Sequence, residues 1–245
     1  MNPLAQALDK QGQRAEARAL YGEVLERRRA DPTTKPEHLA QSISNYASVL
    51  GPEREDEAAA LFKEALAIQA TIVPADDYQA AKMLHNRLWI GFYEIEPTAD
   101  DIAALRHGLE VLQERAGPTA RITASMTLLL GKMLQRVEGS DAAEIEALLR
   151  ASTEAFSPDS DMLSAALMWW GGQLRDMGRL EEALVALERC EVVRQQVPGS
   201  DPSAERAAAQ RATVLRELGR DAEADQVLAE HPGAERFIGS AALFE

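Results

Sequence analysis

Apolar side chains recur at three- and four-residue spacing along most of the chain. Residues 178–187 (GRLEEALVAL) are typical, with Leu180, Leu184 and Leu187 at this spacing. The spacing places the apolar side chains on one face of an amphipathic α-helix. Stretches with this pattern end near proline, which is disfavoured inside a helix because it lacks the backbone N–H donor. The pattern therefore predicts a series of antiparallel helices of roughly 12 to 20 residues each.

One ten-residue pattern recurs at a nearly constant interval. It has glycine at its first position in four of its six copies, glutamate and alanine at its fifth and sixth, and a large apolar residue at its tenth. Its copies begin at positions 12, 53, 96, 139, 178 and 219, which are 39 to 43 residues apart. The copies at 96 and 139 are degenerate, since Asp101 and Glu144 replace the alanine, but Leu105 and Leu148 keep the large position.

A fixed interval of this length is typical of stacked helix-turn-helix repeats. We predict a single array of about six repeats, with a C-terminal cap or tail. The predicted repeats span residues 1–33, 34–75, 76–118, 119–158, 159–199 and 200–232, and residues 233–245 form the cap or tail.

Each position of the pattern has a physical reason. Glycine ends the first helix of a repeat, because it adopts a left-handed turn without a steric penalty from a β-carbon. Alanine follows where the two helices cross closely, and the large residue four positions later fills the space beside it. The glutamate favours the positive N-terminal end of the second helix.

The residues of the fifth copy resemble the tetratricopeptide repeat family. They are Leu167, Trp170, Gly171 and Leu174 on the first helix, Gly178 in the turn, and Ala183, Leu187 and Cys190 on the second helix. The second copy, SISNYASVL followed by EDEAAALFKEALAI, is similar to the longer repeats of kinesin light chains. The resemblance implies an all-α fold, a right-handed superhelix or α-solenoid.

The amino-acid composition favours helices, and the net charge excludes two classes of partner. Alanine and leucine dominate, and aromatic residues make up only 5% of the chain. The net charge of −14 and the pI near 4.8 argue against nucleic acid or an anionic membrane surface as partner. The single cysteine, Cys190, fits a reducing compartment, and no apolar run is long enough to span a membrane. We expect a cytoplasmic protein.

We expect no enzymatic activity and no catalytic, metal or cofactor site. The histidines His38, His85, His107 and His231 are scattered over the chain, without the spacing of a metal site. Cys190 falls on a small stacking position of a second helix, where a cysteine acts as a compact apolar residue.

The resemblance also implies that the first helices of the repeats line a concave groove. Lys132 and Gln135 fall on this face, and from the whole face we select eight candidate residues for partner binding. They are Asn45, Asn86, Trp89, Trp169, Arg175, Arg206, Gln210 and Arg216. Amides can hold an extended peptide backbone, tryptophans can supply apolar anchors, and arginines can attract acidic or phosphorylated groups. The alternatives are solvated polar side chains and tryptophans that belong to the core.

We therefore predict a non-catalytic interaction module that binds a peptide or partner protein as an adaptor or regulator. Acidic groups on the partner would suit the candidate arginines. One alternative is a self-association module of a larger regulatory system, with a homodimer formed through the terminal repeats or the C-terminal segment. Another is a sensor for a small ligand between the third and fourth repeats, where Trp89, Phe92 and Tyr93 gather.

Overall fold

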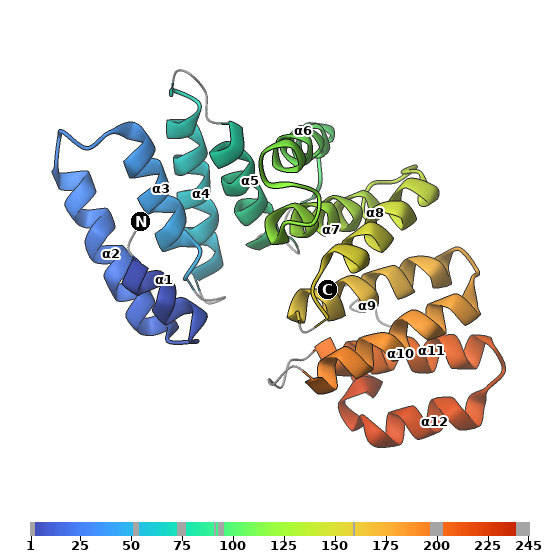
Figure 1. Ribbon diagram of the computed structural model, residues 1–245. Coiled ribbons are helices and arrows are strands. Elements are labelled where there is room, and N and C mark those ends of the chain that lie inside the picture. Colours follow the sequence, from blue (N-terminus) through green and yellow to red (C-terminus); the bar gives the residue numbers. More distant parts are fainter. Residues whose placement is uncertain are drawn as a thin grey trace. The chain divides into compact units, whose positions relative to one another are not determined.

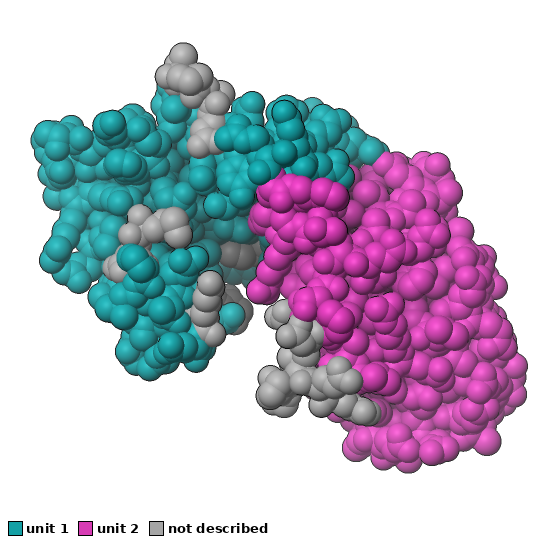
Figure 2. Space-filling view, viewed as in Figure 1, with its two compact units in different colours: residues 1–115 teal, residues 116–245 magenta. Residues whose placement is uncertain are grey.

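The computed structural model describes residues 3–50, 54–72, 77–90, 92, 96–158, 160–196 and 203–238. These residues form α-helices joined by short connections, with one 3-10 helix near the end, and they contain no strand (Figure 1). The chain divides into two compact units, residues 1–115 and 116–245, which Figure 2 shows in different colours. The all-helical repeat architecture predicted from the sequence is confirmed.

Unit 1 contains three consecutive helix pairs. They are α1 (Pro3–Lys10) with α2 (Arg14–Ala30), α3 (Pro36–Ala47) with α4 (Glu55–Gln69), and α5 (Asp77–Ile90) with α6 (Ala99–Ala116). A core cluster runs from α2 to α5 and includes Leu25, Ile43, Phe62 and Met83, all almost fully buried. The apolar faces of α2 to α5 therefore share one core cluster, as expected for stacked repeats.

Unit 2 repeats this arrangement. Its pairs are α7 (Arg121–Gln135) with α8 (Ala142–Ala155), α9 (Asp161–Asp176) with α10 (Leu180–Gln196), and α11 (Ser203–Glu217) with α12 (Asp221–Glu230), followed by the 3-10 helix η2 (Pro232–Phe237). Ala234 and Phe237 of η2 pack into the core cluster formed by α9 to α12. Leu243 and Phe244 of the predicted tail lie outside the described residues.

The turns inside the helix pairs use glycine as predicted. Gly12, Gly139, Gly178 and Gly219 all have positive φ, between 73° and 80°. At Gly178 the backbone N–H of Arg179 donates to the carbonyl of Leu174 at 2.9 Å, the bond that closes a left-handed helix end. The glycine of the repeated pattern is therefore required by the backbone conformation of the turn.

Small residues allow the two helices of a pair to approach closely. A β-carbon added at Gly171 of α9 would lie 2.9 Å from Cγ of Leu187 on α10, and one added at Gly131 of α7 would lie 2.9 Å from Cδ2 of Leu149 on α8. The pattern alanine Ala183 and its large partner Leu187 are both fully buried. The predicted packing of small against large residues is therefore confirmed.

The register predicted for the fourth repeat is wrong by one residue. Leu149 is fully buried and Leu148 is only partly buried, so Leu149 occupies the large position. The turn after Gly139 is one residue longer than the turn after Gly178, because Asp141 caps α8 by accepting a hydrogen bond from the backbone N–H of Ala143 at 2.9 Å.

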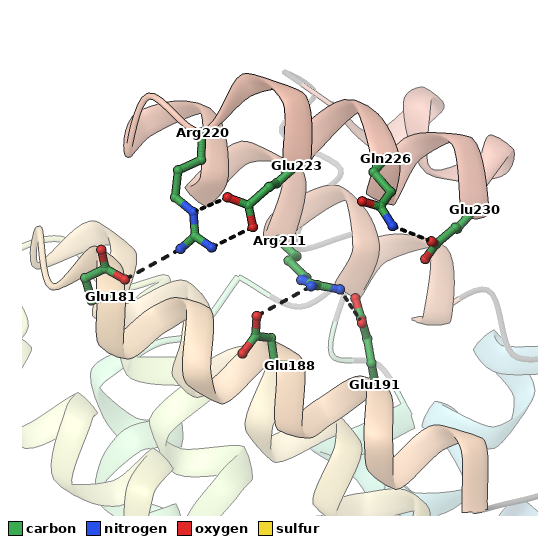
Figure 3. A network of polar contacts seen from close by, with 8 residues as sticks. All are labelled: Glu181, Glu188, Glu191, Arg211, Arg220, Glu223, Gln226 and Glu230. Atoms are coloured by element: carbon green, nitrogen blue, oxygen red, sulfur yellow. Dashed lines mark hydrogen bonds and ion pairs between the residues drawn. The ribbon is translucent and has the colours of Figure 1, made fainter.

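Ion pairs connect the last three helices of unit 2 (Figure 3). Arg211 of α11 donates to Glu191 of α10 at 2.6 Å and lies 3.4 Å from Glu188. Arg220, at the start of α12, makes two short bonds to Glu223 and lies 3.9 Å from Glu181. The side chains of Arg211 and Glu191 are only 23% and 18% exposed, so this pair is shielded from water more than the Arg220 contacts.

We predict that Gly171→Ala lowers the free energy of unfolding by about 1–3 kcal/mol, because the new methyl group collides with Leu187. Urea unfolding measures the change. The control is the same substitution in a Leu187→Ala background, where the collision is removed and Gly171→Ala should cost nothing. An equal loss of stability in both backgrounds would show that this contact does not set the helix spacing.

We predict that Arg211→Ala destabilises the chain by about 1–2 kcal/mol, since it leaves the half-buried carboxylate of Glu191 without its partner. Arg220→Ala is the matched control, and its effect should be clearly smaller because its bonds lie in water. Thermal unfolding of both variants shows which substitution lowers stability more. A larger effect at Arg220 would contradict it.

Candidate functional site

The first helices of the three pairs in unit 2 lie next to one another. Helix α9 packs against α7 on one side and α11 on the other. The second helices α8, α10 and α12 each pack against the first helix of their own pair. Because α9 contacts both α7 and α11, these three first helices form one layer. Polar side chains from all three helices meet in this layer.

Lys132 of α7 is the central charged residue of this layer. Only 6% of the residue is exposed, and its Nζ lies 4.7 Å from the centre of the Trp169 ring on α9. This distance is within the range of a cation–π contact. Burial, together with the positive charges of Arg136 and Arg206, lowers the pKa of Lys132 to about 7. Lys132 is therefore only partly protonated near neutral pH.

Helix α11 contributes Arg206 and Gln210 to this layer, and these two side chains lie one helical turn apart. The guanidinium of Arg206 acts on the charge of Lys132 and lies 5.3 Å from the Phe237 ring of η2. Gln210 is only 2% exposed, and neither the nitrogen nor the oxygen of its amide has a hydrogen-bond partner among the described residues. An unpaired buried amide costs about 1–3 kcal/mol, so a ligand that pairs with it gains that energy.

A pair of amides connects α7 to α9 in the same layer. Gln135 donates to the side-chain oxygen of Gln173 at 2.8 Å. The amide oxygen of Gln135 is buried and has no partner among the described residues. We call Lys132, Arg136, Trp169, Arg206 and Gln210 the α7–α11 cluster, and the two glutamines border it.

The α7–α11 cluster can bind an anion. It combines three cationic side chains with a buried amide that has a donor and an acceptor to offer. Charge-assisted hydrogen bonds to carboxylate or phosphate are strong where the cations are shielded from water. The cluster also lies in a chain with a net charge of −14, so its positive charge differs from the rest of the protein.

One repeat of the chain matches a family model, and the fold of the chain is similar to solved structures. The family model of the tetratricopeptide repeat matches residues 1–30. BtubC (BKLC) from P. vanneervenii has a similar structure, with a TM-score of 0.68 and 16% sequence identity over 89% of this chain and 89% of that chain. Kinesin light chain nearly identical TPR-like repeats from Podosopora anserina match with a TM-score of 0.60 and 15% identity over 82% of this chain and 96% of that chain. The fold is that of tetratricopeptide-like repeats. None of the curated proteins matches the chain.

In these tetratricopeptide-like repeats, three of the predicted site residues come together. Trp169, Arg206 and Gln210 all belong to the α7–α11 cluster. However, the expectation that all three point into an open groove is wrong, because Trp169 and Gln210 are only 3% and 2% exposed. The reason is that adjacent first helices pack so closely that side chains between them are covered. Trp170 is partly buried, packs against the core cluster of α9 to α12, and donates to Glu146.

The other two predicted arginines of unit 2 lie elsewhere. Arg175 donates to Glu217 at 2.6 Å and 2.8 Å, which connects the ends of α9 and α11. Arg216 pairs with Asp225 at 3.3 Å and lines a separate cleft of about 440 Å³ between α11, α12 and η2. Arg206 and Arg216 are ten residues apart on one helix, or about 15 Å. Arg175 and Arg216 therefore form ion pairs away from the α7–α11 cluster.

In unit 1 the predicted residues lie half-buried on first helices. Asn45 of α3 accepts a hydrogen bond from Gln41 at 2.7 Å. On α5, Asn86 lies 3.2 Å from Nδ1 of the buried His85, whose ring stacks on Trp89 with 5.6 Å between the ring centres. A partner role for these three residues stays a prediction.

Sequence reasoning missed how much Lys132 and Arg136 matter. Lys132 falls on the predicted groove face, but its importance comes from its contact with Trp169 and from the charge of Arg206. A sequence signal exists, since Lys132 and Arg136 are four residues apart and so lie on one helix face. Nothing in the sequence shows that this face meets the Arg206 face of α11.

The groups considered for catalysis do not form a reactive site. Cys190 is fully buried, as predicted, and its thiol donates to the carbonyl of Ser164 at 3.2 Å. Burial raises the pKa of the Cys190 thiol, which disfavours the reactive thiolate. Among the described residues, no three His, Cys, Asp or Glu side chains are grouped to hold a metal ion, and no helix has the length and apolar character to cross a membrane.

We predict that Lys132→Met changes how stability depends on pH. The unfolded chain keeps Lys132 protonated up to its ordinary pKa near 10.4, whereas the folded chain loses this proton near pH 7. Wild-type stability therefore gains from this residue as pH rises from 7 to 10, by up to about 1.4 kcal/mol per pH unit. The stability of Lys132→Met relative to the wild type should fall over the same range.

Urea unfolding between pH 6.5 and 9.5 measures this difference. Lys63→Met, at an exposed position of α4, is the matched control and should show no such trend. A difference between Lys132→Met and the wild type that does not change with pH would mean that Lys132 keeps an ordinary pKa.

Proposed function

We propose that the chain is a non-catalytic module that binds a peptide or partner protein through its first helices, as an adaptor or regulator. The observation that carries the proposal is the α7–α11 cluster, which contains three cationic side chains and the buried amide of Gln210. Neither polar atom of that amide has a hydrogen-bond partner among the described residues. Repeat proteins of this kind use extended surfaces of stacked helices for binding. The proposal places the protein in the cytoplasm.

The chemistry of the cluster suits a partner with acidic groups. Lys132, Arg136 and Arg206 supply positive charge, and the glutamines beside them can donate to a peptide carbonyl and accept from a peptide N–H. Opposite charges speed association and exclude partners of the wrong sign. In unit 1, the amides of Asn45 and Asn86 and the ring of Trp89 would contribute contacts of the same kinds.

The ion pairs of Arg211 and Arg220 indicate that the cations of unit 2 differ in role. Arg211 is held by Glu188 and Glu191, and Arg220 by Glu181 and Glu223 (Figure 3). These arginines connect helices within unit 2. Arg211 and Arg220 therefore serve packing between helices, whereas Lys132, Arg136 and Arg206 belong to the cluster that contains the buried amide of Gln210. Self-association and small-ligand sensing stay predictions that no contact described above favours.

Affinity capture from an extract of the native cell tests the proposal. The variant is Lys132→Met with Arg206→Met, and we expect it to retain a partner at least tenfold less well than the wild type, because both attractive charges are removed. The matched control is Arg150→Met with Arg189→Met, which removes two exposed charges from α8 and α10. It should capture the partner as the wild type does.

A partner that all three proteins capture equally would contradict the proposal. Circular dichroism of each variant confirms that loss of capture is not loss of folding. Asn45→Ala with Asn86→Ala is the corresponding variant of unit 1. Weaker capture by this variant would extend the binding surface to α3 and α5.

A further inference from the structure

A cleft of about 440 Å³ lies between α11, α12 and η2. Its volume lies within the range of known ligand pockets, about 300–1,000 Å³. The residues that line it are Arg216, Asp225, Leu228, Ala229, Pro232 and Glu235. None of them belongs to the α7–α11 cluster, so the cleft is a separate surface of unit 2.

Helical spacing explains why these residues share one cleft. Asp225, Leu228 and Ala229 are three and four residues apart, so they lie on one face of α12. Pro232 and Glu235 are three residues apart, which is one turn of the 3-10 helix η2. Two adjacent elements therefore each present one face to the same space.

Two kinds of contact hold η2 beside the cleft. Ala234 and Phe237 are buried in the core cluster formed by α9 to α12. The backbone N–H of Ala234 donates to the carbonyl of His231 at 2.9 Å. The backbone N–H of Ile238 donates to the carbonyl of Glu235 at 3.2 Å. A wall that is already ordered favours binding, because a ligand does not have to order it.

The lining of the cleft carries more negative than positive charge. Asp225 and Glu235 supply two carboxylates, whereas Arg216 supplies one guanidinium. Arg236, the residue after Glu235, lies 4.6 Å from the centre of the Phe237 ring and is not part of the lining. One carboxylate is therefore in excess, and the cleft attracts a cation.

The ion pair between Arg216 and Asp225 is loose. Its Nη2 and Oδ1 atoms are 3.3 Å apart, and the two side chains are 42% and 72% exposed. Charge-assisted hydrogen bonds are normally about 2.7–2.9 Å long. By comparison, Arg175 makes two bonds to Glu217, at 2.6 Å and 2.8 Å. A second cation can therefore approach Asp225 without breaking a strong bond.

The rest of the lining is apolar and consists of Leu228, Ala229 and Pro232. Long basic side chains bind surfaces of this kind, because their methylene groups pack on apolar atoms while the charged end meets polar groups. Arginine suits carboxylates better than lysine does, since its planar guanidinium forms paired hydrogen bonds.

We propose that this cleft binds an arginine side chain of a partner peptide. The methylene groups lie against Leu228 and Pro232, and the guanidinium bonds to Asp225 and Glu235. Charge complementarity favours this occupant. The proposal goes beyond the function proposed above, because it adds a site for a basic group. The capture experiment with Lys132→Met and Arg206→Met concerns other residues, so either proposal can fail without the other.

An acetylated and amidated pentapeptide with a central arginine between alanines is the probe, because the arginine carries its only charge. NMR of the full chain follows the backbone amides of Leu228, Ala229 and Glu235 during the titration. The control peptide has citrulline, a neutral analogue of similar shape, in place of arginine. We expect the arginine peptide to bind at least about tenfold more tightly. Equal affinity of the two peptides, or no shift of these amides, would overturn the proposal.

Two variants of the lining should change the affinity for the arginine peptide in opposite directions. Glu235→Gln should weaken binding about threefold to fivefold, since it removes one of the two carboxylates. Arg216→Met should strengthen binding about threefold, since it removes the cation that competes for Asp225. Glu154→Gln, at an exposed position of α8, is the matched control and should bind as the wild type does.

Circular dichroism establishes that all three variants are folded. Unchanged affinity in Glu235→Gln, or weaker binding by a folded Arg216→Met variant, would contradict the proposal. An equal loss of affinity in Glu154→Gln and Glu235→Gln would contradict it as well, because the peptide would then sense only the net charge of the chain.

Two further measurements test other occupants of the cleft. Sedimentation at micromolar concentration should show that the chain that binds the peptide is a monomer. A dimer that Ala229→Gln dissociates would overturn the proposal in favour of a second copy of the chain. Peptide binding that occurs only in a variant with Leu243→Ser and Phe244→Ser would overturn it in favour of the C-terminal segment.

Discussion

The close approach of the two helices in each pair is the constraint on which the structure of unit 2 depends. Gly131 and Gly171 leave room for Leu149 and Leu187, with a distance of only 2.9 Å from the position of a β-carbon to the leucine. Because the pairs are packed at this distance, the first helices α7, α9 and α11 come to lie next to one another. Side chains between them are covered, whatever their polarity.

The same constraint explains the unusual side chains of the first-helix layer. Lys132 is pressed against the Trp169 ring, and Gln210 is enclosed without a partner among the described residues. Both arrangements cost stability in the free chain. Residues that cost stability at one place are expected where a protein binds something. The ion pairs of Arg211 and Arg220, by contrast, stabilise the contacts of α10 with α11 and α12.

Much of the fold could be predicted because it depends on local spacing. The turn glycines, Ala183 and Leu187 follow from the repeated pattern, since backbone conformation and helix periodicity are local properties. The register of the fourth repeat could not be predicted, because the pattern does not show that Asp141 lengthens the turn. The burial of Trp169 and Trp170 was harder to predict. Neighbouring residues on a helix point in directions that differ by about 100°, and only the packing of the helix decides which of the two side chains is buried.

The site itself depends on contacts between residues far apart in the sequence. Tertiary packing brings Arg175 into an ion pair with Glu217, and it brings Arg206 close enough for its charge to act on Lys132. The most direct test of this account is the titration of the lysine side chains of the ligand-free chain by NMR. The account predicts that Lys132 loses its proton near pH 7 and that Arg206→Met raises its pKa. Titration of Lys132 above pH 10 in both proteins, as for a lysine in water, would contradict it.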